Sequence, residues 1–334
     1  MKIYNLFKLK SPFLVPLIAV LIVLCTDFCR AQEAVVKDYK IYFGKASVKG
    51  VEFLVLRRME KGGRVVFLGV DPSTLNVQLL DIPATKVTAL NWQQVLIGFK
   101  GTPYIQAIQA ASSQSFALQD AGIVHGFPRA HGVTVTVDLC PSHKPLDRII
   151  FTTLIAEFKN IEKPVPIALS LTGRFMLTHG EDLNWLKGLV KSGDISITWI
   201  NHTYNHHYNP KVPLRDNFLL EPGTDLNFEI LGTEIAMLQN GLLPSVFFRF
   251  PGLVSDQSIV SKVLSYGIIP VGSDAWLAKG QAPNSGSIIL IHGNGNEPVG
   301  VNDFIKLLKA EKIAVMGNEW LMYDLRESVE DEFQ

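Results

Sequence analysis

The feature that most constrains the fold is an alternation of apolar runs and amphipathic stretches, which begins near Gly132 and continues almost to the end of the chain. The runs are of strand length, and the stretches between them carry apolar residues at helical spacing. Such repeated units are typical of a parallel sheet covered by helices, open or closed into a barrel. We therefore predict an α/β fold for residues 132–334, with strands at VTVTVD, VPIALSLTG, ISITWI, SVFFRF, IIPVG and SIILIH.

Residues 32–100 have a different pattern of apolar and turn-forming residues. Short β-branched and aromatic runs are divided by KG, EKGG and DPST, which are turn signals of hairpins. We predict a small all-β domain here and a linker over residues 101–131. The small all-β domain contains no cluster of residues that suggests chemistry.

The first 31 residues are interpreted as a signal peptide. Lys2, Lys8 and Lys10 precede the apolar run PFLVPLIAVLIVLC, and Ala31 is a small residue just before a plausible cleavage site. We therefore expect export to the periplasm or the extracellular space, with no stable membrane span after cleavage. A retained membrane anchor is the alternative, although the apolar run is short for a span.

The net charge argues against some classes of partner. Without residues 1–31 the 31 basic and 31 acidic residues become 27 and 30, a net charge near −3. Such a balance does not suggest nucleic acid or an anionic membrane surface as a partner.

Only Cys140 of the three cysteines would remain after removal of the signal peptide, so the mature chain needs a core that is stable without a disulfide.

Chemically capable side chains end or follow the predicted strands. In parallel α/β folds the carboxyl ends of the strands meet on one face, and that face carries the site. Each of these residues alone could be an ordinary turn, ion-pair or core residue, but their joint placement indicates a functional site. They are Asp138, His202, Arg249, Asp274 and His292.

A pair of histidines suggests a metal. His202 and His206 lie four residues apart in NHTYNHHYNP, a spacing that places two imidazoles on one side of a helical turn. His207 could be an exposed neighbour or a substitute ligand, and the residues alone leave this open. Cys140 could be a nucleophile, but a buried structural thiol is the preferred interpretation.

Taken in order, these residues resemble the motifs of the polysaccharide deacetylases, carbohydrate esterases that share the chitooligosaccharide deacetylase homology domain. The likeness runs from about Thr134 to Ala310 and comprises TVDLCP, HTYNH, RFPG, SDAW and LIH. It implies a distorted (β/α) barrel with fewer than eight units. It also implies metal-dependent hydrolysis of N-acetyl, and possibly O-acetyl, groups of a polysaccharide or cell-wall glycan.

The resemblance assigns His202 and His206 as ligands of a divalent metal, usually Zn²⁺ in this family. The family's further ligand is an aspartate, but Leu139 occupies that position and cannot coordinate. We therefore expect a weakened or altered metal site. Residues that could replace the missing ligand are Asp138, His143, His207 and Cys140.

The resemblance also implies catalytic roles. Asp138 would be the general base and His292 the general acid that protonates the leaving amine. Arg249 would orient Asp138, and Asp274 would hold His292 in its charged form. Two alternatives follow from the missing aspartate: a metal-independent C–N hydrolase on the same barrel, and a glycan-binding protein that has lost the reaction.

Substrate contacts are expected from a turn and from aromatic residues. Gly252 follows Pro251 where the family has a tyrosine, and it would offer its backbone N–H to the oxyanion. Tyr204, Tyr208 and Trp276 could supply stacking faces for sugar rings or could simply pack.

Overall fold

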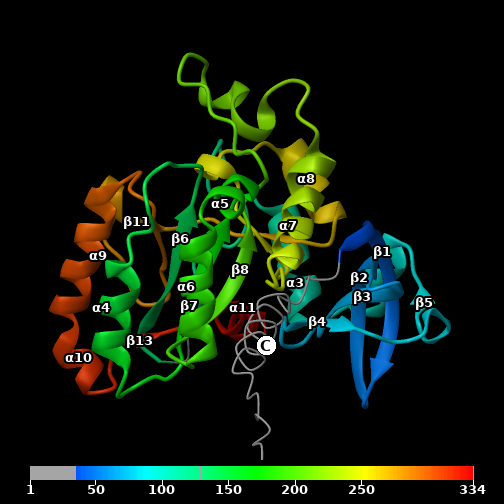
Figure 1. The fold of residues 1–334 in the computed structure, drawn as a ribbon, viewed down its shortest axis with the longest axis horizontal. Helices are drawn as coiled ribbons and strands as arrows, with labels where there is room; N and C mark the ends of the chain where they lie inside the picture. Colours follow the sequence, from blue (N-terminus) through cyan, green and yellow to red (C-terminus); the bar gives the residue numbers. More distant parts are fainter. Residues whose placement is uncertain (1–34, 128–129, 334) are drawn as a thin grey trace, which may run out of the picture.

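The computed structural model of the protein describes residues 35–127 and 130–333. An antiparallel sheet lies beside a larger α/β unit (Figure 1). The expected signal peptide, residues 1–31, lies outside the described residues. Within the described ranges, no helix has the length and apolar character needed to cross a membrane.

The predicted all-β region forms the antiparallel sheet, whose strand order is β4-β3-β2-β1-β5. The β1–β2 and β2–β3 hairpins each have a two-residue loop, Lys49-Gly50 and Gly62-Gly63, with positive φ at both positions. This is the loop conformation that matches the twist of paired strands. The strands are β1 (Val36–Val48), β2 (Val51–Lys61), β3 (Arg64–Val70), β4 (Val77–Leu80) and β5 (Thr88–Ala89).

The range expected to be a linker contains a buried helix. After the short helices η1 (Ala84–Lys86) and α2 (Trp92–Gly98), α3 (Pro103–Ser113) buries Tyr104 and Ile105. The Tyr104 hydroxyl donates to the Gly267 carbonyl oxygen at 2.6 Å. Leu54 of β2, α3 and strands of the α/β unit share one apolar core. The chain before residue 132 is thus packed into the rest of the molecule.

The α/β unit has a curled parallel sheet, as predicted. The strand order is β10-β9-β8-β7-β6-β12-β11, with β13 beside β6, and every described pair is parallel. The described ladders do not join β10 to β11, so this is a distorted, open barrel. The strands are β6 (Gly132–Leu139), β7 (Val165–Leu171), β8 (Ile195–Asn201), β9 (Phe247–Phe248), β10 (Ile269–Pro270), β11 (Ala275–Trp276), β12 (Ile288–His292) and β13 (Leu321–Met322).

Helices cover the sheet, with α4, α9 and α10 together on one side (Figure 1). β6 is buried along its whole length, as expected for a strand covered on both faces. The α-helices are α4 (Ile149–Phe158), α5 (Gly173–Thr178), α6 (Gly180–Lys191), α7 (Thr233–Gln239), α8 (Gln257–Ser265), α9 (Pro298–Ala310), α10 (Lys312–Met316) and α11 (Leu325–Phe333). The single-turn elements are η2 (Leu214–Asp216), η3 (Phe218–Leu220), η4 (Phe228–Gly232), η5 (Pro251–Leu253) and η6 (Leu277–Lys279).

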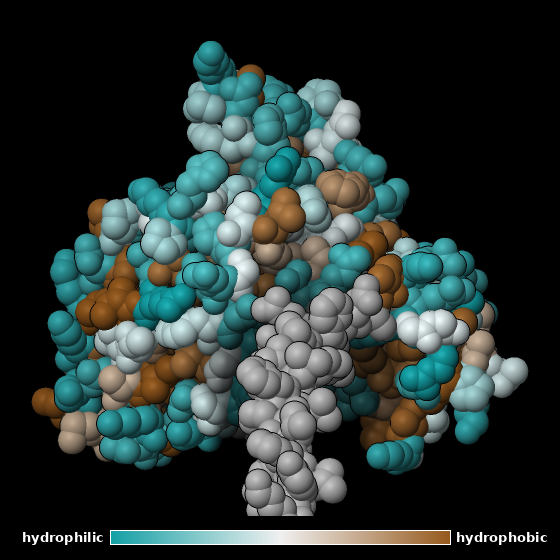
Figure 2. Space-filling view, in the orientation of Figure 1, coloured by the Kyte–Doolittle hydropathy of each residue, from teal (hydrophilic) through white to brown (hydrophobic). Residues whose placement is uncertain are grey.

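A long connection, residues 202–227, joins β8 to η4 and forms the lobe at the top of Figure 1. This lobe rises from the carboxyl end of β8. The visible surface of the lobe is mostly hydrophilic (Figure 2).

Candidate functional site

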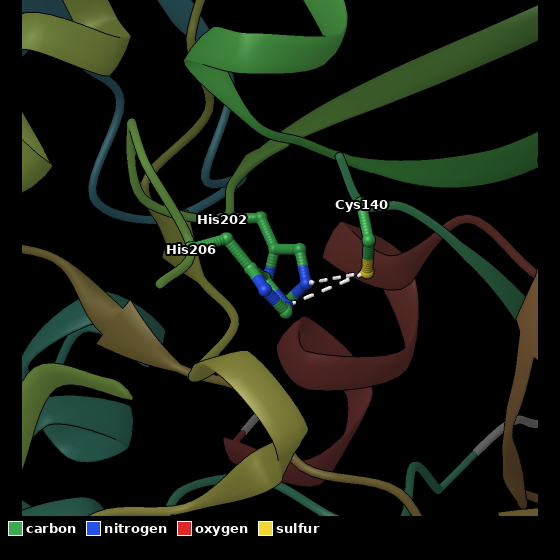
Figure 3. A group of neighbouring side chains, drawn as sticks. All are labelled: Cys140, His202 and His206. Carbon is green, nitrogen blue, oxygen red and sulfur yellow. Dashed lines mark hydrogen bonds between the residues drawn. The ribbon is translucent and has the colours of Figure 1, made fainter. Parts of the chain in front are cut away.

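Three possible metal ligands converge where β6 and β8 end. The Cys140 sulfur lies 3.6 Å from Nε2 of His202 and 3.4 Å from Nε2 of His206. One ligand atom from each of the three residues lies within 4.8 Å of the other two. The side chains point toward one another in Figure 3. We call these three residues the Cys-His-His cluster.

The two histidines are not on a helical turn, which differs from the prediction. The chain after β8 forms an irregular turn, with left-handed backbone at Thr203 and His206. The Glu229 carboxylate accepts the backbone N–H groups of Tyr204 and Asn205, each at 2.9 Å. These bonds replace the backbone partners that a helix would supply.

The orientation of His202 prepares it as a ligand. Its Nδ1 lies 2.8 Å from the Arg249 carbonyl oxygen. Since a carbonyl only accepts, Nδ1 must carry a proton, and Nε2 is the ring nitrogen left to act as a metal ligand. Nε2 also lies 3.7 Å from Oδ2 of Asp138. The ring is fully buried.

The alternation of side chains along β6 explains why Cys140 replaces the missing aspartate. Successive side chains of a strand point to opposite faces. Leu139 is fully buried in the apolar core, whereas Asp138 and Cys140 both lie beside His202. Asn294 Nδ2 donates to the Cys140 carbonyl oxygen at 2.5 Å and thereby holds this position.

The environment of Cys140 favours a thiolate. Burial opposes ionisation, but the charges of His206 and His292 and hydrogen bonds with His202 and His206 outweigh it, so the pKa of the Cys140 thiol is well below its usual value. A thiolate and two imidazoles form a donor set that suits Zn²⁺. The residues present therefore fit the metal that the resemblance implies.

Two of the other three candidate replacement ligands lie outside the cluster. His143 is exposed. His207 is also exposed, and its Nδ1 pairs with Oε2 of Glu221 at 2.5 Å. Asp138 is close enough to His202 to be a further ligand.

Asp138 and His292 flank the cluster from adjacent strands. They are register partners at the ends of β6 and β12. Burial opposes the charge of Asp138, but Arg249, His202 and His292 outweigh it and lower the pKa of the carboxyl group. Burial also opposes protonation of His292, but the negative charge of Cys140 and hydrogen bonds with Cys140 and Glu297 raise the pKa of this ring well above its usual value.

The partner of His292 is Glu297, and the prediction of Asp274 is wrong. Glu297 Oε2 lies 2.8 Å from Nδ1 of His292 and accepts Nε1–H of Trp276 at 2.8 Å. Asp274 instead pairs with Nδ1 of His125 at 2.7 Å, because the chain segment before β6 forms β-bridges to Val271 and Ser287. The only signal for Glu297 in the sequence was an acidic residue five positions after His292.

Arg249 does not orient Asp138 through a direct hydrogen bond in the described structure. Its Nη2 donates to Thr136 Oγ1 at 2.9 Å, while its Nε and Nη1 and Oδ1 of Asp138 have no partner among the described residues. Arg249 therefore acts on Asp138 through charge, and its carbonyl oxygen fixes His202.

A cavity of about 590 Å³ opens beside the cluster and is lined by Cys140, His206 and His292. Gly252 also lines it and has φ 59°. A Cβ on Gly252 would lie 2.7 Å from the Phe218 ring, so glycine suits this turn for space as well as for conformation. The cavity thus has the predicted acid and the predicted glycine turn in its wall.

The predicted aromatic contacts differ in their placement. Tyr208 is 52% exposed, lines the cavity and stacks on Phe218 with 5.1 Å between ring centroids. Tyr204 does not line this cavity, because its ring packs on Phe228. Trp276 lines the cavity but is 8% exposed, and Lys279 Nζ lies 3.5 Å from the centre of its ring. Tyr208 therefore offers the best face for stacking.

No model of a known protein family matches the sequence. Solved structures that resemble the chain include a family 4 carbohydrate esterase from Bacillus anthracis (16% identity, TM-score 0.46, covering 73% of this chain and 97% of that one). Another is the family 4 carbohydrate esterase PdaA of Bacillus subtilis, with 14% identity and a TM-score of 0.44, covering 66% of this chain and 97% of that one. A third is a family 4 carbohydrate esterase from Streptomyces lividans in complex with acetate, with 16% identity and a TM-score of 0.39, covering 57% of this chain and 91% of that one. Family 4 carbohydrate esterases are the family that the sequence motifs resemble.

Proposed function

We propose that the protein is an exported, metal-dependent deacetylase that hydrolyses N-acetyl groups of a polysaccharide or cell-wall glycan. The observation that supports this most strongly is the Cys-His-His cluster, which has Asp138 beside its His202 and shares the cavity wall at Cys140 and His206 with His292. A cavity with convergent polar groups and shifted pKa values is the usual form of an active site. Export is proposed from residues 1–31 alone.

Cys140, His202 and His206 would hold a divalent metal, most favourably Zn²⁺. When bound, such a metal supplies Lewis-acid chemistry by lowering the pKa of water and polarising a carbonyl oxygen. The thiolate would supply the negative charge that the absent aspartate gives in the family. Leu139 would take no part, because its side chain lies in the core.

Asp138 and His292 would divide the proton transfers. Asp138, held as a carboxylate by neighbouring positive charge, would accept a proton from the attacking water. His292, held protonated with Glu297 at its Nδ1, would deliver a proton to the leaving nitrogen. An amide nitrogen leaves readily only when it is protonated, so the acid is as necessary as the base.

The test is acetate release from N-acetylated and O-acetylated oligosaccharides, with protein stripped by a chelator and protein refilled with Zn²⁺. We expect release to be lost on stripping and restored by Zn²⁺. Release that ignores the chelator would support a metal-independent C–N hydrolase, and glycan binding without release would support a binding protein. His292→Ala should lose turnover but retain its metal content.

Metal content tests the assignment of Cys140 directly. Cys140→Ser should lower the bound Zn²⁺ measured by elemental analysis, whereas Ser142→Ala, two residues away and with its hydroxyl on the Lys144 backbone, should not. Leu139→Asp should not improve the site and should destabilise the core, since it buries an unpaired charge. Unchanged Zn²⁺ in Cys140→Ser would exclude the thiolate as a ligand.

A further inference from the structure

The chain between α3 and β6 closes the open side of the parallel sheet. Residues 114–126 follow the edge between β10 and β11, where no described strand pair closes the barrel. Ser255 N donates to Leu118 O at 3.0 Å, and Ile123 N donates to Pro270 O at 3.0 Å. This segment, which lies outside the resemblance to the deacetylases, therefore forms part of the barrel wall.

Gln119 is the residue of this segment that reaches the cavity. Its Nε2 donates to the Gly252 carbonyl oxygen at 2.6 Å. The same side chain lines the 590 Å³ cavity together with His206 and His292. Gln119 thus links the closing segment to the glycine turn beside the candidate acid.

The hydrogen bond to Gly252 fixes the orientation of the Gln119 side-chain amide. A carbonyl oxygen can only accept, so the amide nitrogen must face Gly252, and Oε1 is the other end of the group. Oε1 can only accept hydrogen bonds. Another acceptor in the same wall, Oε2 of Glu297, already receives bonds from His292 and Trp276.

We propose that Gln119 is a substrate-binding residue, whose Oε1 accepts a hydrogen bond from an amide N–H or a hydroxyl group of an N-acylated sugar. At the same time its Nε2 holds the turn at Gly252 and Leu253, where both residues have left-handed backbone. The identity of the ligand rests on the proposed function. The placement of the side chain does not.

A second glutamine in the segment offers a matched control. Gln114 Oε1 accepts Gly122 N–H at 2.5 Å, and Gln114 Nε2 donates to Asp120 O at 3.4 Å. Gln114 therefore ties the segment to itself, and it does not line the cavity. Loss of Gln114 should loosen the segment, whereas loss of Gln119 should remove a contact to the ligand.

The experiment measures binding of fully N-acetylated chitotetraose by calorimetry to the metal-loaded protein and to Gln119→Ala, Gln119→Met and Gln114→Ala. Both Gln119 variants should raise Kd about tenfold, the value of one hydrogen bond to a ligand. Methionine has nearly the same volume as glutamine. A loss of affinity that comes only from the cavity left by alanine would therefore not appear in Gln119→Met. Gln114→Ala should lower Tm and leave Kd within about twofold of the wild type.

Equal Kd values for the wild type and both Gln119 variants would overturn the proposal, as would a wild-type protein that does not bind the sugar. Acetate release, measured on the same samples, reports separately on the proposed function. A wild-type protein that binds without releasing acetate, and whose Gln119 variants bind more weakly, would refute deacetylation and uphold the role of Gln119.

Discussion

Two arginines among the described residues, Arg57 and Arg249, are almost fully buried but use their hydrogen-bond donors differently. Arg57 donates from Nε and Nη2 to the Glu234 carboxylate and from Nη1 to two backbone carbonyl oxygens. Arg249 donates from Nη2 to Thr136, while its Nε and Nη1 have no partner among the described residues. All three nitrogens of the Arg57 guanidinium donate, and we call this group saturated, whereas only one nitrogen of Arg249 donates to a described residue.

The difference is the one expected between a structural charge and a functional one. Arg57 of β2 and Glu234 of α7 join the antiparallel sheet to the α/β unit, and each of the three Arg57 guanidinium nitrogens donates at least one hydrogen bond. Arg249 lies beside Asp138, whose Oδ1 is also without a described partner. Burial lowers the pKa of Arg249, and the charges of Asp138 and Asp120 oppose this effect. Unpaired buried polar groups are tolerated mainly where chemistry needs them.

The largest effect is expected at the saturated arginine. Glu234→Ala leaves the Arg57 charge buried without its partner and should lower the free energy of unfolding by about 3–5 kcal/mol. The measurement is urea unfolding followed by circular dichroism. Glu52→Ala, which breaks the exposed pair with Lys45, is the control and should lose less than about 1 kcal/mol. If the free energy of unfolding fell equally little in Glu234→Ala and Glu52→Ala, the saturated Arg57 pair would not be a structural element of the fold.

The second prediction concerns the unsaturated arginine. Arg249→Lys keeps the charge but loses the bond to Thr136 and the fixed shape of the guanidinium. We expect kcat/KM for acetate release to fall about 100-fold, with a smaller loss of stability than in Glu234→Ala. Arg148→Lys, at the partly exposed pair with Asp182, should keep kcat/KM within about twofold. A large loss of stability with full activity would make Arg249 a structural residue.

The third prediction compares two carboxylates that the sequence could not tell apart. Glu297→Gln removes the charge at Nδ1 of His292 and should lower kcat about tenfold. Asp274→Asn removes the charge beside His125 and should lower Tm while kcat stays within about twofold. Steady-state kinetics and thermal unfolding of both variants check this. The reverse result would restore Asp274 as the partner of the acid.

The sequence predicted what depends on local pattern. Hairpins follow from glycine turns, and the parallel sheet follows from the alternation after Gly132. Strand ends predicted Asp138, His202 and His292 as neighbours, and the histidine spacing added His206. The structure places these four residues close together.

The sequence did not predict what depends on how the chain folds back on itself. The choice between Leu139 and Cys140 depends on which face of β6 each side chain occupies at the end of the strand. The pairing of Glu297 with His292 depends on the path of a loop. The segment around Gln119 carries no pattern that predicts its packing, because it contacts residues more than a hundred positions away.

The smallest expected effect belongs to a half-buried carboxylate, Glu162, that has no cationic partner among residues 35–127 and 130–333. Glu162 accepts Met322 N–H at 2.9 Å. Burial raises the pKa of Glu162 from 4.5 to about 6, with a further contribution from the charge of Glu327. Unlike Glu234, this group has no arginine partner among the described residues to offset its burial, so burial favours its neutral form.

Between pH 4.5 and about 6 the folded state therefore binds more protons at Glu162 than the unfolded state does, and the free energy of unfolding must fall as the pH rises. The full shift would correspond to about 2 kcal/mol, which solvent screening of this partly exposed side chain reduces to about 1 kcal/mol. Glu162→Gln should remove that part of the pH dependence and raise the stability at pH 7 by the same amount. Urea unfolding at several pH values would show it, with the exposed Glu181→Gln as the control. If the free energy of unfolding changed with pH in the same way for the wild type and Glu162→Gln, the prediction would be wrong. Burial would then not raise the pKa of Glu162 above that of an exposed glutamate.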